Sequence, residues 1–74
     1  MITSAELKPR VEQEVGVALA PDFFRLAEQR ARRKLDWINN RAGRQYGEDG
    51  YGDDYLVILT ADTVREIALS ASSL

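Results

Sequence analysis

The segment from residue 21 to residue 42 constrains the fold more than any other part of this chain. Its apolar residues recur with spacings of three and four, which is the period of an α-helix; they are Phe24, Ala27, Ala31, Leu35, Ile38 and Ala42. Pro21 suits the first helical position, Asp22 complements the positive end of the helix dipole, and Gly43 suits the C-cap. The pattern predicts a long helix over residues 21–42, about 30 Å in length.

A second helix is predicted near the N-terminus, over residues 4–18. Thr3 is a favourable N-cap and Glu6 follows three residues later, which is the capping-box pattern. One face of this helix carries apolar residues at helical spacing, namely Leu7, Val11, Val15 and Ala18. Pro9 lacks an N–H and crowds the preceding turn. We therefore expect a kink at Pro9, or a short first turn with the main helix starting there.

The C-terminal part of the chain has two interpretations. In the first, Thr60 caps a helix over residues 61–72, and residues 55–59 form a short buried strand, which makes the fold α+β. In the second, Asp53 or Asp54 caps one helix from residue 55 to residue 72. The apolar face of that single helix would be Val57, Ala61, Val64, Ala68 and Ala71. A lone strand cannot satisfy its backbone hydrogen bonds in so short a chain, so we favour a mainly α, small helical domain.

Residues 43–54 are predicted to form a Gly/Asp-rich acidic loop, because four glycines interrupt this segment. Its notable side chains are the acids Glu48, Asp49, Asp53 and Asp54 and the aromatic residues Tyr46 and Tyr51. The segment lacks the glycine and glutamate that a calcium-binding EF-hand loop needs at its sixth and twelfth positions. We expect no metal here, and a contact that becomes ordered when a partner binds.

The 74 residues fit one domain, 1–74, and contain neither cysteine nor histidine. Disulfides, the usual zinc sites and the common nucleophile–base pairs of enzymes are therefore excluded. We expect a non-enzymatic protein without cofactors. A core of this size seldom supplies more than about 3–5 kcal/mol, so association is the remaining source of stability. A homodimer that pairs leftover apolar surface is the expected form.

Localisation and charge give weaker constraints. The first residues lack the basic and apolar regions of a signal peptide, and the longest apolar run, residues 55–59, is far too short to span a membrane. These features predict a cytoplasmic protein without membrane contact. Residues 1–44 hold nine lysine and arginine residues against six acids, whereas residues 45–74 hold one against six. This asymmetry indicates either a charged binding surface or two halves that neutralise each other.

The long helix carries a second stripe that its own neighbours do not neutralise. Arg32 has Glu28 and Asp36 four residues away on either side, so we expect Arg32 to be compensated and to face solvent. Arg30 and Arg33 have no acid at these spacings. The stripe consists of Leu26, Arg30, Arg33 and Trp37, with Phe23, Lys34 and Arg41 beside it.

This aromatic and cationic face has three interpretations. It can bind a protein, because tryptophan, tyrosine and arginine are enriched at binding hot spots. It can bind nucleic acid, although a pI of about 5.0 argues against this. Alternatively, the acidic loop folds back over it and the aromatic residues complete the core. The predicted partner-binding residues are Leu26, Arg30, Arg33, Lys34, Trp37, Arg41, Tyr46 and Tyr51.

We expect a small adaptor or regulatory inhibitor that docks on a larger protein. By analogy of size and composition alone, phage or mobile-element accessory proteins are often of this kind. A structural subunit of a larger, for example viral, assembly is the competing class.

Overall fold

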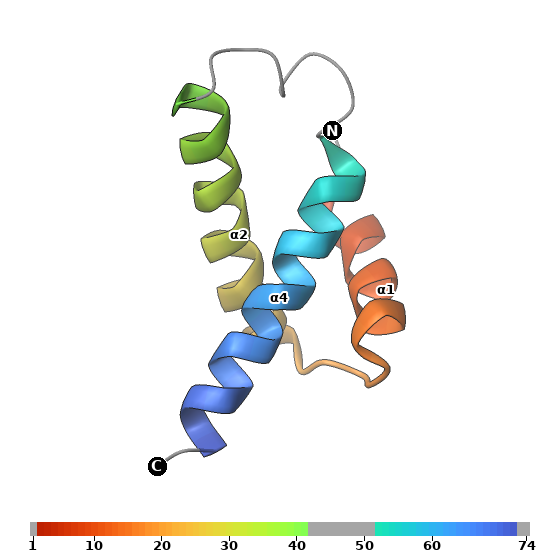
Figure 1. Ribbon diagram of the computed structural model, residues 1–74. Helices are drawn as coiled ribbons and strands as arrows, with labels where there is room; N and C mark the ends of the chain where they lie inside the picture. Colours follow the sequence, from red (N-terminus) through yellow and green to blue (C-terminus); the bar gives the residue numbers. More distant parts are fainter. Residues whose placement is uncertain (1, 42–51, 73–74) are drawn as a thin grey trace.

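The computed structural model describes residues 2–41 and 52–72, and these ranges contain three α-helices and no strand (Figure 1). Helix α1 spans Ser4–Val15, α2 spans Pro21–Arg41 and α4 spans Asp53–Ser72. The prediction of a mainly α, small helical domain is confirmed. Helix α4 packs against both other helices, whereas α1 and α2 make few contacts with each other. No described helix is long and apolar enough to cross a membrane.

Helix α1 begins as predicted but ends earlier. The Thr3 hydroxyl accepts a hydrogen bond from the Glu6 N–H at 3.2 Å, and the Glu6 carboxylate accepts one from the Thr3 N–H at 3.2 Å. The predicted end at residue 18 is wrong. Gly16 adopts the left-handed conformation, with φ of 81°, and its N–H donates to the Glu12 carbonyl at 2.8 Å. Ala18 lies beyond this cap and is exposed, because the helix that would have buried it has already ended.

Pro9 lies inside α1, which runs through it as one helix. The alternative in which the main helix starts at Pro9 is therefore wrong, whereas the kink stays a prediction. Leu7 and Val11, one on each side of this proline in the sequence, are fully buried, and Val15 packs at the edge of the core. Burial of this face stabilises the helix despite the missing N–H of Pro9.

The C-terminal helix differs most from the prediction. The strand at residues 55–59 and the helix start at residue 61 are both wrong, because α4 is continuous from Asp53. A helix pairs its backbone groups internally, which a lone strand cannot do. Thr60 is not a cap: it is fully buried within α4, and its hydroxyl donates to the Leu56 carbonyl at 2.7 Å. Asp53 and Asp54, predicted in the acidic loop of residues 43–54, belong to the first turn of α4.

Each of the three helices contributes to one apolar core. The predicted stripe of α2 places Phe24, Ala27 and Ala31 inside it, and Leu35 and Ile38 pack at its edge. The other buried apolar residues are Ile2, Leu7, Val11, Leu19, Leu56, Val57, Leu59, Ala61 and Val64. The core therefore occupies one side of α2 and leaves the opposite side of this helix exposed.

Candidate protein-binding face on α2

The side of α2 that faces away from the core carries five of the predicted partner-binding residues. We call this the cationic-aromatic face; it consists of Leu26, Arg30, Arg33, Lys34 and Trp37. The Trp37 residue is 59% exposed and Leu26 is 41% exposed, although both are large and apolar. The three cationic residues are exposed as well. The indole of this stripe and its cationic neighbours are therefore all exposed in the structure.

Four of these residues surround one shallow depression. Arg30, Arg33, Lys34 and Trp37 border an open volume of about 420 Å³. Leu26 lies on the same side of α2 but does not border this volume. A flat indole flanked by cationic groups provides an apolar surface with a positive rim, which suits an apolar group carried between acidic side chains.

Arg30, Arg33 and Lys34 form no ion pair within residues 2–41 and 52–72. The ion pairs in those ranges join Lys8 to Glu12, Arg10 to Asp54, Arg32 to Glu28 and Arg65 to Asp62. None of them involves Arg30, Arg33 or Lys34. Phe23, which the sequence places beside the stripe, is half-buried and packs against the core. The described part of the face is thus positive and apolar.

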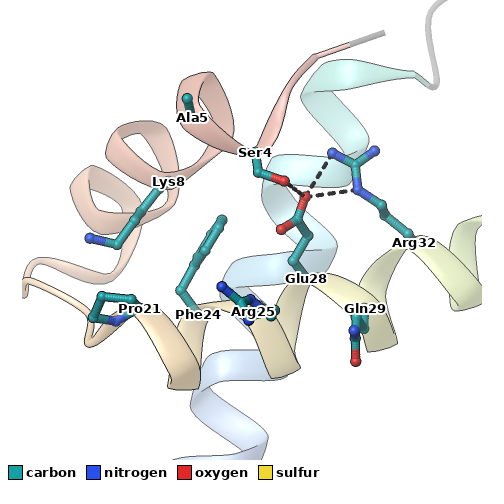
Figure 2. Close-up of a pocket in the computed structure, with 9 residues that line it drawn as sticks. All are labelled: Ser4, Ala5, Lys8, Pro21, Phe24, Arg25, Glu28, Gln29 and Arg32. Atoms are coloured by element: carbon teal, nitrogen blue, oxygen red, sulfur yellow. Dashed lines mark hydrogen bonds and ion pairs between the residues drawn. The ribbon is translucent and has the colours of Figure 1, made fainter.

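Arg32 behaves differently from its neighbours and joins a polar network that the sequence did not indicate (Figure 2). Its predicted pairing with Glu28 is confirmed at 2.9 Å, and its side chain, which is 30% exposed, faces solvent only in part. The Glu28 Oε2 atom also accepts a hydrogen bond from the Ser4 hydroxyl at 2.5 Å. Arg32 donates a further bond to the Ile2 carbonyl at 3.1 Å. The network therefore fastens the start of α1 to the middle of α2.

An open groove of about 560 Å³ lies where α1 and α2 diverge beside this network. On the α1 side the groove is lined by Ser4, Ala5 and Lys8, and Figure 2 shows the Ser4 hydroxyl directed at Glu28 of α2. The α2 side consists of Pro21, Phe24, Arg25, Glu28, Gln29 and Arg32. The most buried polar side chains of the groove, Ser4, Glu28 and Arg32, already bond to one another. These residues therefore hold α1 and α2 together, and their polar groups are not left open for a ligand.

Two acids of the predicted loop also have structural partners. The Asp53 carboxylate accepts a hydrogen bond from the Ile2 N–H at 3.0 Å, and Asp54 pairs with Arg10 at 2.7 Å. Both contacts hold the N-terminal segment against α4. In the two described ranges no group of three or more acidic, histidine or cysteine side chains could hold a metal ion. The other predicted residues, namely the Arg41 side chain, Tyr46, Glu48, Asp49 and Tyr51, lie outside the described residues.

Glu12 fastens the connection between α1 and α2. Its carboxylate accepts a hydrogen bond from the Leu19 N–H at 2.7 Å and lies 3.3 Å from the Lys8 ammonium. The Leu19 N–H is the main cause that lowers the pKa of Glu12, and the hydrogen bond and charge of Lys8 lower it further. The pKa of Glu6 is lowered chiefly by the backbone N–H of Thr3. These carboxylates act as local caps, well apart from the cationic-aromatic face.

Comparison with known proteins adds no further constraint. No protein-family model, curated protein or solved structure matches this chain. The proposal for its function therefore depends on the chemistry of the site.

Proposed function

We propose that this chain is a small, non-enzymatic, cytoplasmic protein-binding adaptor or regulatory inhibitor that docks on a larger protein through the cationic-aromatic face. The observation that carries the proposal is the exposure of Trp37 beside Arg30, Arg33 and Lys34. A tryptophan held at the surface by a long helix is costly to leave in water and strongly favourable to bury in a complex. Tryptophan and arginine are also the residues that dominate binding energies at interfaces.

The chemistry of the face specifies the chemistry of its partner. The depression beside Trp37 suits one large apolar side chain, and its positive rim favours aspartate or glutamate on either side of that side chain. Arg30 and Arg33 can each form two parallel hydrogen bonds to a carboxylate. An acidic segment or surface with a central apolar anchor is therefore the proposed partner.

The absence of cysteine and histidine from the sequence supports a binding role rather than an enzymatic one. The same indole and cations would also suit single-stranded nucleic acid, in which a base stacks on the indole and phosphates pair with the arginines. The acidic pI of about 5.0 disfavours this alternative.

Affinity capture with matched variants tests the proposal. The full chain is used as bait, and the variant Arg33→Glu with Trp37→Ala is compared with Arg25→Glu. Arg25 is an exposed arginine of the same helix, about 120° away from the centre of the face, so its substitution changes charge equally but leaves the face intact. The captured protein is then purified, and its affinity for the wild type and for the single variants Arg33→Glu and Arg25→Glu is measured from the fluorescence of Trp37, the only tryptophan of this chain.

We expect Arg33→Glu to weaken binding by about 10-fold to 100-fold and Arg25→Glu to change it little. Both variants should retain the helical circular dichroism of the wild type. Equal binding by all variants would refute the proposal. Loss of the helical signal in the double variant would show that these residues support the fold instead. Binding to single-stranded DNA that weakens steeply between low and physiological salt would favour the alternative function.

A further inference from the structure

Between residues 55 and 64, helix α4 exposes only Ile58 and Asp62, whereas five of the six residues 65–70 are exposed. The α4 stripe consists of Ile58, Asp62, Arg65 and Leu69, with spacings of four, three and four residues. Ile58 is 51% exposed and Leu69 is 70% exposed, and the two charged residues between them are exposed too. Figure 1 shows α4 crossing the other two helices, with its C-terminal part extending beyond them.

The order of residues in this stripe is self-complementary. An apolar residue stands at each end of the stripe, and an acid and a base stand between them. The spacings of four, three and four residues are the same when the stripe is followed in the opposite direction. A two-fold axis between residues 63 and 64 therefore places Ile58 opposite Leu69 of a second copy. The same axis places Asp62 opposite Arg65 of that copy, and both contacts occur twice.

We propose that two copies of this chain associate through their α4 stripes in antiparallel orientation. A parallel pairing would place Asp62 against Asp62 and Arg65 against Arg65, where like charges repel. The antiparallel pairing replaces both repulsions with attractions and buries the two exposed apolar side chains at each end of the contact. The partner for this surface is thus a second copy of the chain.

Contacts within each chain prepare the charged centre for this pairing. Arg65 lies 3.1 Å from Asp62 of its own helix, and its other terminal nitrogen donates to the Glu14 carbonyl of α1 at 3.2 Å. These two bonds hold the guanidinium between Asp62 and α1 and so reduce the conformational entropy that Arg65 loses on association. Asp62 can accept from both arginines at once, because a carboxylate offers several acceptor positions.

This interface is separate from the cationic-aromatic face, which lies on α2. Association through α4 would leave Trp37 accessible in both copies, so that the dimer presents two docking faces. The inference therefore does not depend on the proposed function.

Disulfide trapping tests the register of the pairing, because the chain has no cysteine of its own. In the variant Ile58→Cys with Leu69→Cys, the cysteine at position 58 of one copy lies opposite the cysteine at position 69 of the second copy. Mild oxidation should therefore give a covalent dimer. Each single variant should stay uncrosslinked, since its two identical cysteines would lie more than about 16 Å apart, beyond disulfide reach. The same separation prevents a disulfide within one helix. Crosslinking of the single variants as readily as the double variant would overturn the antiparallel register.

Sedimentation equilibrium of the unmodified full chain tests the association itself. We expect a concentration-dependent rise to twice the chain mass. Arg65→Asp should weaken association at least 10-fold, and Asp62→Arg with Arg65→Asp should restore it, although this double variant also lacks the arginine bonded to Glu14. Trp37→Ala serves as the control and should leave association unchanged. A wild type that stays monomeric up to millimolar concentration, or an Arg65→Asp variant that associates as tightly as the wild type, would overturn the proposal.

Discussion

Replacement of Glu28 by alanine should destabilise this fold more than any other substitution of a charged residue among those described. The Glu28 side chain is only 9% exposed, and its Oε2 atom accepts from the Ser4 hydroxyl at 2.5 Å and from two nitrogens of Arg32 at 2.9 Å. Hydrogen bonds to a charged group contribute about 1.5–3 kcal/mol each, but bonds that share one oxygen do not add. Arg32 is 30% exposed, so water can solvate the cation that is left behind.

These terms give an expected loss of about 2–3 kcal/mol for Glu28→Ala, well below the 3–5 kcal/mol of a fully buried pair. Glu28→Gln keeps the shape and some of the hydrogen bonds, so we expect a loss of about 1 kcal/mol. Gln29→Ala is the matched control, since Gln29 is exposed on the next position of α2. The change at this position should stay within about 0.5 kcal/mol.

Urea unfolding followed by circular dichroism at 222 nm measures all three variants. A domain of this size is expected to have about 3–5 kcal/mol of stability, so the alanine variant should be partly unfolded in buffer. If Glu28→Ala unfolds at the same urea concentration as Gln29→Ala, the network does not fasten α1 to α2 and the reasoning is refuted.

Three further predictions follow from the core, the cap and the carboxylates. Leu7→Ala, at a fully buried position, should cost about 2.7–5 kcal/mol in urea unfolding, and a loss below 1 kcal/mol would contradict its place in the core. Gly16→Ala should cost about 1 kcal/mol of unfolding free energy, because Gly16 has positive φ while a new Cβ meets no atom within 4 Å. The lowered pKa of Glu12 means that its contribution to stability is present at neutral pH and is lost as the pH falls below about 4. Glu12→Gln should flatten the pH dependence of unfolding in this range, and an unchanged slope would contradict the bond to the Leu19 N–H.

The sequence predicted the elements whose signals are local. The capping box at Thr3 and the apolar period of α2 both lie within a few residues of the structure they determine, and the structure contains both. The end of α1 was missed because Ala18 continues the apolar period, although Gly16 was the available signal for a C-cap. A glycine in the left-handed conformation ends a helix even where the apolar period of the sequence continues beyond it.

The start of α4 was missed for a different reason. A threonine after an apolar run has the pattern of an N-cap, but the same hydroxyl can bond to a carbonyl one turn earlier within a helix, as Thr60 does. The local sequence cannot tell a threonine that caps a helix from a threonine that lies within one, because the outcome depends on how the segment is buried against α1 and α2. The network around Glu28 was missed likewise, because its partners Ser4 and Ile2 are distant in the sequence.

On α2, the sequence indicated which side of the helix is exposed but not the contacts of each cationic residue. Helical projection separated Arg30 and Arg33 from Arg32 by their neighbours four residues away. It did not indicate that Arg32 turns toward the N-terminal segment, which requires the tertiary fold.

Acrylamide quenching of Trp37 fluorescence in the isolated wild-type protein tests the central claim most directly, because this residue is the only tryptophan. With 59% of the residue exposed, quenching should approach that of a short tryptophan peptide, and emission should be that of a hydrated indole. Dilution of the protein should not change this result, because the proposed contact between two copies lies on α4. A blue-shifted emission with several-fold weaker quenching would show that the indole is covered, and the proposed docking face would then not exist in the unbound protein.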